Sequence, residues 1–538
     1  MHLPELPVEP ESKPAPPVSW LTGQGRRSGR VVVLVKPEQD RNIHPLGLLY
    51  MGDALKKAGF DVRLYFLAPE DTQKIIDEIH EIDPIFVGLS VLTGVQTKIA
   101  ADLSEGLKQR NPTLPIVWGG VHPTIDPQMC LNEDFIDIVV DGDGEETCID
   151  LAKCLTNGGE LNKVLGIVFM QDGKMNHTGK RPMLRDLDRY KPDWSLINME
   201  DHIVDYEGQR TAEFLTSRGC PFECTFCSVP TTSERLWRTH SQSFLQENLS
   251  LLRKQHDVTN VIFVDDLIST HTKRMLEILE VSRKVGMAIS TCQIRLDGIN
   301  KAVLDQLITS DVRRIFIGIE SGSDRMLKLV KKGFNRQRIL DQFKLIAQYP
   351  ISVTAPLIIG YPTETWDDIR RTIDLALEMT EIIPATVVTV QTYNPYPGSE
   401  LFGLALKEGF EPPKRVAEYE NYDVFFASFN LDWIPWADEN TLRKFHIIDG
   451  YAKMLTHDPS SNLFRTWGKR MLAELARIRL RHESFALPWE VFMMYRFNRY
   501  YRASFSEAAE WLGYNKKRAK WRYVSKRATV QTPYVDGK

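Results

Sequence analysis

The chain has 538 residues, 43% of them hydrophobic, and a formal net charge of −4. This length predicts about two to four domains, each with its own core, and it excludes a disordered or fibrous protein. The balanced charge excludes a chain that is basic throughout, as many nucleic-acid-binding proteins are. The longest apolar runs have the length of strands, so we expect no membrane span and a cytoplasmic location.

Residues 30–180 alternate apolar runs with amphipathic stretches. The alternation predicts an α/β fold with a doubly wound, Rossmann-like, five-stranded parallel sheet, closed by a hairpin through Gly173. Ligands of such sheets bind beyond the carboxyl ends of the strands. The predicted strands are Val31–Val35, Val62–Leu67, Ile85–Leu89, Ile116–Trp118 and Ile136–Val140. The predicted helices are Pro45–Ala58, Glu70–Ile82, Val95–Gln109 and Glu145–Leu155.

A second alternating series begins near residue 211 and predicts a partial (βα)6 barrel, in which chemistry occurs where the strands end. Its strand candidates are Phe214–Ser217, Val261–Val264, Ile289–Ile294, Ile315–Ile319, Val353–Ile359 and Thr386–Gln391. Beyond it the pattern is helical. The predicted division of the chain is a disordered leader (1–29), a sheet domain (30–180), a linker (181–210), a barrel (211–420) and a helical C-terminal domain (421–538).

Three of the seven cysteines, Cys220, Cys224 and Cys227, form a cluster after the first barrel strand. Three thiolates at this spacing can bind three irons of a [4Fe–4S] cluster and leave the fourth iron open to another ligand. Structural zinc would need a fourth ligand, and no second cysteine pair or histidine pair lies nearby in the sequence. The odd number of cysteines gives no sign of a disulfide framework.

The Cys-x3-Cys-x2-Cys spacing resembles the radical S-adenosylmethionine superfamily, over roughly residues 211–403. The resemblance implies that the three cysteines hold a catalytic [4Fe–4S] cluster, and that S-adenosylmethionine bound to the open iron is cleaved to a 5′-deoxyadenosyl radical. Asp265 could equally cap a helix. Gly360–Glu364 and Tyr396–Gly398 are further candidates for the barrel mouth. By the same resemblance, the candidate contacts to the cofactor are Phe226, Asp265, Arg295, Glu320 and Ser321.

The first domain carries a second set of motifs at its strand ends. It resembles the cobalamin-binding signature of corrinoid proteins, and Asn42 replaces the aspartate that supports the axial histidine in that signature. An amide supports the histidine ring less strongly than a carboxylate, so His44 is either a cobalt ligand or a loop histidine at a helix start. Gly119-Gly120-Val-His122-Pro123 also resembles cobalamin-binding radical enzymes. The candidate contacts to cobalamin are Asn42, His44, Gly47, Ser90, Leu92, Gly119 and Gly120.

Together the two resemblances imply a cobalamin-dependent radical enzyme of the class B methyltransferase type, which methylates an unactivated carbon through methylcobalamin. One alternative is radical oxidation or cyclisation without methyl transfer, as in the anaerobic magnesium-protoporphyrin ester cyclases, which the segment 187–196 resembles. An alternative from another class is a cobalamin-binding regulator or carrier with an inactive barrel. A tRNA-modifying enzyme is disfavoured because the chain has no second cysteine triplet.

The C-terminal region is rich in aromatic and basic residues, especially over Phe485–Trp511. This pattern is typical of a core or a domain interface. It could also form a lid over a large apolar small-molecule substrate, or a basic surface that contacts anionic lipid or an acidic electron donor of the flavodoxin or ferredoxin type. No RNA-binding module is recognisable, which disfavours nucleic acid as a partner.

Overall fold

The computed structural model describes residues 29–38, 43–206, 208–312, 314–422, 433–455, 463–486 and 488–491. The predicted leader before Gly29, the candidate Asn42 and the aromatic stretch beyond Val491 therefore lie outside the described residues. No helix of the described part is long and apolar enough to cross a membrane.

The N-terminal unit is built on one seven-stranded sheet of order β2-β1-β3-β4-β5-β6-β7. The first five strands are parallel, as predicted, and the expected hairpin adds two antiparallel strands to the same sheet. The strands are β1 Val31–Pro37, β2 Asp61–Leu67, β3 Val87–Ser90, β4 Ile116–Gly119, β5 Ile138–Val140, β6 Ile167–Gln171 and β7 Lys174–His177.

Helices cover both faces of this sheet because successive residues of a strand point to opposite sides. In β1, Val32 and Leu34 join one core, and Val33 and Val35 join the other. Helices α1 (Leu46–Lys57) and α6 (Gly144–Asn157) cover the first core, whereas α2 (Thr72–Ile82) and α3 (Val95–Arg110) cover the second. The short helices α4 (Val121–Ile125) and α5 (Pro127–Leu131) follow β4 and were not predicted.

The second unit is an open arc of six parallel strands, which confirms the partial barrel. Strand β9 pairs with β12 and β12 with β13, and β14 pairs with β15 and β15 with β16. A 2.9 Å hydrogen bond from the Ile294 N–H to the Phe316 carbonyl joins the two halves. The strands are β9 Gln209–Phe214, β12 Asn260–Phe263, β13 Ala288–Thr291, β14 Arg314–Phe316, β15 Ser352–Ile359 and β16 Val387–Thr392.

The start of the barrel differs from the prediction. The first strand was expected at Phe214–Ser217, but β9 already ends at Phe214. An antiparallel edge strand, β8 (Val204–Tyr206), lies in the range that was expected to be linker. Ser217–Arg218 forms β10, which pairs with β11 (Arg238–Thr239). The strand candidate was wrong because β9 mixes polar and apolar residues and therefore shows no apolar run along its length.

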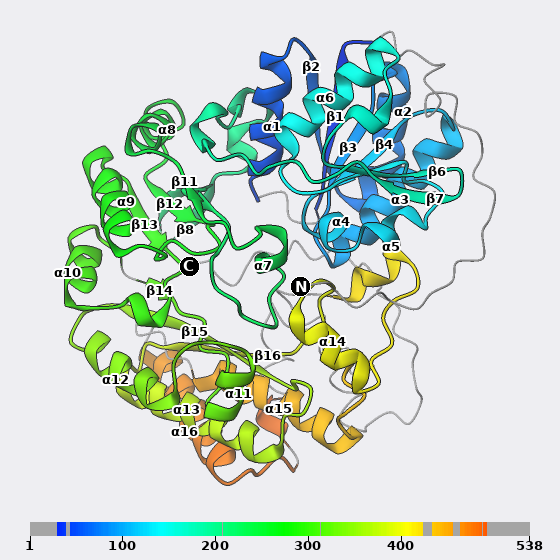
Figure 1. Ribbon diagram of the computed structural model, residues 1–538. Helices are drawn as coiled ribbons and strands as arrows, with labels where there is room; N and C mark the ends of the chain where they lie inside the picture. Colours follow the sequence, from blue (N-terminus) through cyan, green and yellow to red (C-terminus); the bar gives the residue numbers. More distant parts are fainter. Residues whose placement is uncertain are drawn as a thin grey trace.

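Helices pack outside the arc and beyond its last strand (Figure 1). The final two, α15 (Glu439–Leu455) and α16 (Leu463–Arg481), pack against β16 and α13, in agreement with the predicted helical C-terminal region. The helices of the barrel are α7 Val229–Thr232, α8 Gln242–Gln255, α9 Thr272–Val285, α10 Lys301–Thr309, α11 Asp324–Leu329, α12 Arg336–Ile346, α13 Trp366–Ile382 and α14 Glu400–Lys407.

A segment that follows the barrel returns to the N-terminal unit. We call residues 414–422 the strap. Its 3-10 helix η7 (Val416–Asn421) packs against α3, and Val416 is fully buried in the second core of the N-terminal sheet. Arg415 forms a 2.6 Å ion pair with Glu133 beside α5. The strap is therefore a second connection between the two units, in addition to the linker between β7 and β8.

Candidate functional site

The three clustered cysteines lie in one loop between β10 and α7, which we call the cysteine loop (219–228). Its first residue, Gly219, has a φ of +84°, and a Cβ there would overlap the Leu236 carbonyl oxygen. Its N–H donates a 2.9 Å hydrogen bond to Asp266 at the end of β12. Only glycine fits this close approach, which fixes where the loop leaves the barrel strand.

The thiols of Cys220, Cys224 and Cys227 share one environment. Burial raises the pKa of Cys220 and raises that of Cys227 to about 12, and the neighbouring Cys224 thiolate adds to both effects. Among the described residues, no three Cys, His, Asp or Glu side chains converge as the ligands of a single metal ion do. The thiolates of a cubane cluster bind three different irons and need not converge on one point. Three neighbouring cysteines in one loop therefore fit the cluster.

Backbone contacts from two other segments hold the cysteine loop in place. Thr225, between Cys224 and Phe226, donates its N–H to the Val330 carbonyl at 3.3 Å and its hydroxyl to the Leu329 carbonyl at 3.1 Å. The Leu401 N–H of α14 donates to the Thr225 carbonyl at 2.8 Å. The loop is therefore positioned by the carboxyl-end segments of several barrel strands.

Two cations face the aromatic rings of the cysteine loop. The Arg295 guanidinium lies 3.8 Å from the ring centre of Phe222, and the Lys332 ammonium lies 5.8 Å from that of Phe226. Lys332 also forms a buried 3.0 Å ion pair with Glu320. Of the predicted contacts, Phe226, Arg295 and Glu320 thus gather around the cysteines.

Glu320 is held in an unusual backbone conformation, with a φ of +70°. Its carbonyl accepts a 2.8 Å hydrogen bond from the Ile358 N–H, so β15 fixes this residue. The space for its carboxylate exists because Gly318 has no side chain: a Cβ there would lie 2.5 Å from Glu320 Oε1 and 3.0 Å from Lys332 Nζ. A strained non-glycine residue that is held from both sides is typical of a functional site.

Two other predicted contacts have polar atoms that are engaged within the protein. The buried Asp265 carboxylate accepts hydrogen bonds from the Thr216 hydroxyl at 2.7 Å and the Ser217 hydroxyl at 2.5 Å, and burial raises its pKa to about 6. It therefore fixes the turn between β9 and β10. The fully buried Ser321 hydroxyl lies 3.1 Å from that of Thr372 on α13.

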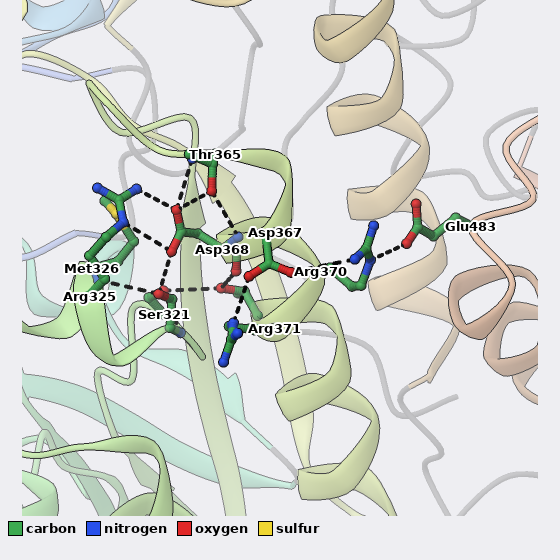
Figure 2. Close-up of polar contacts among 11 residues, drawn as sticks. Ser321, Arg325, Met326, Thr365, Asp367, Asp368, Arg370, Arg371 and Glu483 are labelled. Carbon is green, nitrogen blue, oxygen red and sulfur yellow. Dashed lines mark hydrogen bonds and ion pairs between the residues drawn. The ribbon is translucent and has the colours of Figure 1, made fainter.

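Ser321 belongs to a network that joins the segment after β14 to the start of α13 (Figure 2). Asp368 is its centre. This carboxylate accepts hydrogen bonds from the Thr365 hydroxyl at 2.6 Å, from the Ser323 hydroxyl at 2.5 Å and from the Arg325 guanidinium. Although burial opposes the shift, these bonds hold the pKa of Asp368 well below its usual range. The network is part of the scaffold behind Glu320.

On the N-terminal unit, the predicted motif residues after β3 and β4 form one structure. The Val91 N–H donates to the Gly119 carbonyl at 2.8 Å, and the His122 N–H donates to the Val91 carbonyl at 3.1 Å. Gly120 has a φ of +97°, and a Cβ there would lie 3.3 Å from the Ser90 hydroxyl oxygen. The two strand ends can approach this closely only because Gly120 has no side chain.

Two residues of the same motifs are open. Leu92 is 39% exposed at the end of β3, an unusual exposure for a leucine beside two buried cores. A Cβ on the exposed Gly47 in α1 would meet no protein atom within 4 Å. The open space at Gly47 and the exposed apolar side chain of Leu92 both fit a bulky ligand such as cobalamin.

His44 is in a different situation. Its side chain is only 1% exposed, its Nδ1 accepts a 3.4 Å hydrogen bond from the Glu213 N–H of β9, and its ring meets Trp194 edge-on at 5.9 Å. The histidine is thus enclosed between the N-terminal unit, the linker and the barrel. Its Nε2 atom has no hydrogen-bond partner among the described residues, so the cobalt ligand and the loop histidine both remain predictions.

The two predicted sites face one another across the units. Helix α4, which follows the Gly119–Gly120 pair, packs against α7, which follows the cysteine loop. A Cβ on Gly398 would lie 3.1 Å from that of Ile125 in α4 and 3.5 Å from the Thr231 methyl group in α7. The Thr231 hydroxyl donates a 2.6 Å hydrogen bond to the Gly398 carbonyl.

Between these elements lies a group of side chains that we call the tyrosine cluster, Tyr361, Tyr393, Tyr396, Tyr419 and Tyr422. It belongs to a third apolar core, separate from the two cores of the sheets, which Phe226 of the cysteine loop also touches. The predicted strand-end motifs contained Tyr361 and Tyr396, but no motif indicated Tyr419 and Tyr422. Their only signal is the density of tyrosine between residues 393 and 422.

Comparisons with known proteins agree with this geometry. The B12 binding domain family matches residues 31–152, and the radical SAM superfamily matches residues 214–376. An uncharacterized methyltransferase of Pyrococcus horikoshii is 31% identical over 67% of this chain and 78% of the relative. The anaerobic magnesium-protoporphyrin IX monomethyl ester cyclase of Rubrivivax gelatinosus is 28% identical over 67% of this chain and 66% of its own length.

Among solved structures, the cobalamin-dependent S-adenosylmethionine radical enzyme OxsB, with aqua-cobalamin and S-adenosylmethionine bound, has the same fold. Its TM-score is 0.65 at 18% identity, over 90% of this chain and 75% of that one. Both family matches and the relative from Pyrococcus horikoshii confirm the two resemblances in the sequence. The chain belongs to the cobalamin-dependent radical S-adenosylmethionine methyltransferase family.

Proposed function

We propose that this enzyme transfers a methyl group from S-adenosylmethionine, by way of cobalamin, to an unactivated carbon of a small molecule. The observation that carries the proposal is the opposition of α4 and α7, which brings the glycine pair of the N-terminal unit to the cysteine loop of the barrel. A methyl group held on one cofactor must reach a substrate activated by the other. Facing sites suit this requirement.

Cys220, Cys224 and Cys227 would hold the cluster, and Phe226, Arg295 and Glu320 would line the place of S-adenosylmethionine. Ser90, Leu92, Gly119, Gly120 and Gly47 would line the place of cobalamin. When bound, the cluster supplies the electron that cleaves S-adenosylmethionine, and cobalamin carries the methyl group. Asp265 and Ser321 are positioning residues in this proposal, because their polar atoms are engaged by Thr216 and Thr372.

The chain's own contribution is to orient the reactants and to exclude water. Glu320 and Lys332 neutralise one another beside the loop, so this pair adds no net charge next to the cluster. Apolar and aromatic side chains of the third core pack against Phe226 of the cysteine loop and exclude water on that side. A dry site limits quenching of a reactive intermediate.

The enzyme needs a source of single electrons, and we propose a small acidic flavodoxin or ferredoxin. The carrier would approach near the cysteine loop, where the three cysteines are only partly buried.

A second candidate is oxidation or ring closure without methyl transfer. The similarity to the magnesium-protoporphyrin cyclase of Rubrivivax gelatinosus, 28% identical over 67% of this chain, favours it. Both reactions need the same cofactors at the same barrel mouth. They differ in whether the methyl group of S-adenosylmethionine leaves the sulfur.

The test uses the full chain, reconstituted anaerobically with iron, sulfide and hydroxocobalamin, and S-adenosylmethionine labelled in its methyl group. Methyl transfer predicts S-adenosylhomocysteine, label on cobalamin, and 5′-deoxyadenosine. The second candidate predicts 5′-deoxyadenosine alone, with the label still on methionine, and that outcome would exclude methyl transfer. Replacing Cys224 by serine should abolish 5′-deoxyadenosine, whereas serine at the partly buried Cys154, outside the loop, should not.

A further inference from the structure

The tyrosine cluster contains buried polar atoms that no other group of the described protein satisfies. The side chains of Tyr361, Tyr419 and Tyr422 are fully buried, and their hydroxyls have no hydrogen-bond partner in the described part of the chain. The Nε2 atom of His122, also fully buried, has none either. Buried polar groups are nearly always paired in native proteins, and leaving one unpaired costs free energy comparable to a lost hydrogen bond.

Buried tyrosines elsewhere in the molecule are paired. The hydroxyl of Tyr50 lies 3.0 Å from His240 Nε2, and that of Tyr451 donates to Glu490 at 2.7 Å. Both side chains are as buried as those of the cluster. The orphaned hydroxyls are therefore a property of this place in the fold and not of tyrosine burial in this protein.

Ring contacts connect the cluster to both proposed cofactor sites. Tyr361 meets Phe226 of the cysteine loop with 6.3 Å between ring centres. On the other side, Tyr419 meets His122, two residues after the glycine pair, at 4.7 Å, and Tyr422 lies 4.8 Å from Tyr419. The unpaired atoms thus lie between the two sites, where a substrate has to be.

Most polar groups around the cluster are neutral or paired. The exception is Asp126 near Tyr419, whose carboxylate caps α5 by accepting a 3.1 Å hydrogen bond from the Met129 N–H. Burial lowers the pKa of His122 to about 3, so its ring is neutral. Burial raises the pKa of Glu364, beside Tyr361, to about 8, so this carboxyl is mostly protonated and uncharged at pH 7. The charged Glu320 and Lys332 pair with one another. A charged ligand would find no free counter-ion among these groups.

We propose that the tyrosine cluster lines the substrate site, and that this site binds an uncharged, flat ring system whose edge carries hydrogen-bonding groups. The inference rests on the proposed function, for which it specifies the class of substrate. Aromatic rings offer faces for stacking, and the orphaned hydroxyls and His122 offer neutral donors and acceptors to the edge of the ligand.

The first test removes single hydroxyls and keeps the rings. In Tyr419→Phe and Tyr422→Phe, an atom without a partner is lost, so the melting temperature of the substrate-free protein should not fall. The matched control is Tyr451→Phe, which removes an equally buried hydroxyl that bonds Glu490 and should lower the melting temperature. A fall in the cluster variants as large as in this control would show that the hydroxyls already have partners, such as ordered water.

The second test uses titration calorimetry on the anaerobically reconstituted holoprotein with three probes of one ring size. Indole is uncharged, indole-3-acetate is an anion and tryptamine is a cation. Indole should bind at least about tenfold more tightly than either ion. Tyr419→Phe should weaken indole binding by about fivefold, as expected for one lost hydrogen bond, whereas Tyr451→Phe should not change it.

Equal binding of the three probes, or indole affinity that is unchanged in both cluster variants, would overturn the inference. Cleavage of S-adenosylmethionine by the wild-type holoprotein is measured in the same preparation. If cleavage occurs but indole does not bind selectively, the assignment of the tyrosine cluster to the substrate site is wrong and the proposed function stands. If cleavage is absent while indole binds as expected, the proposed function fails.

Discussion

Arg218, the residue before the cysteine loop, donates a 2.8 Å hydrogen bond to Glu145 in the first turn of α6. The side chains are 16% and 4% exposed, so the pair is largely removed from water. Arg218 also lies 4.8 Å from the ring centre of Tyr50 on α1. One arginine thus connects the start of the cysteine loop to two helices of the N-terminal sheet.

Replacing Glu145 by glutamine should destabilise the contact between the units, because the buried guanidinium loses its closest carboxylate. We expect the free energy of unfolding to fall by about 1.5–3 kcal/mol, measured by urea denaturation. The control is Glu280→Gln, whose partner Arg283 lies at the same 2.8 Å but on an exposed helix face, and which should show no measurable change. Equal effects of the two substitutions would contradict a role for burial.

Gly47 offers a test of the cobalamin site that is independent of activity. In Gly47→Leu the new side chain meets no protein atom near its Cβ, and leucine favours a helix more than glycine, so the ligand-free protein should be as stable as wild type or more so. Cobalamin affinity should fall by at least about tenfold, measured by absorbance after gel filtration. Gly403→Leu, another helix position with open space, should keep the cofactor. Full retention in Gly47→Leu would place cobalamin elsewhere.

A methyl group at Gly318 should disturb the Glu320–Lys332 pair. The added Cβ of Gly318→Ala would lie within 3.0 Å of both side chains, which must then move. We expect about a tenfold or larger loss in the rate of 5′-deoxyadenosine formation, because small displacements near reacting groups are costly. Iron content should stay at the wild-type value. Gly403→Ala serves as the control, and a normal rate in Gly318→Ala would argue against a role for Glu320.

Asp368 should make the stability of the barrel depend on pH. Its pKa is lower in the folded protein than in the unfolded chain, so its contribution is complete above about pH 4–5 and is lost as the pH falls toward the folded pKa. At pH 7, Asp368→Asn should lower the free energy of unfolding by about 1.5–3 kcal/mol. The difference from wild type should shrink as the pH is lowered below about 4.

The neighbouring Asp367 is the natural control for this experiment (Figure 2). Its side chain is 58% exposed and contacts Arg371 at the surface, so Asp367→Asn should change stability little at any pH. A constant difference between Asp368→Asn and wild type from pH 7 to pH 3 would show that the carboxylate charge is not what stabilises the network.

The sequence predicted the two sheets and the cysteine loop because these depend on local patterns. Alternation of apolar and polar residues located five parallel strands, and a fixed spacing identified the cysteines. It missed α4 and α5, whose five residues each are too few to show helical periodicity. It also misplaced the first barrel strand, since Gln209–Phe214 owes its pairing to β8 and β12 and not to an apolar run.

Contacts between distant residues were beyond sequence reasoning. The hydrogen bond from Thr216 to Asp265 joins two residues that are 49 positions apart, at the ends of two neighbouring strands. The contact of Tyr419 with His122 depends on the strap, which is anchored by an ion pair between residues 282 positions apart. No local pattern reports such pairs, so the residues of the tyrosine cluster could be found only in three dimensions.

The path of the strap also has a consequence for how the protein is made. Val416 completes a core whose other members precede residue 169, so the N-terminal sheet cannot finish burying α3 until most of the chain has left the ribosome. Domains usually mature in the order of their synthesis. Here the N-terminal sheet waits for a segment that follows the whole barrel, and a ribosome that stalls within the barrel would release a nascent chain with an open apolar surface on α3.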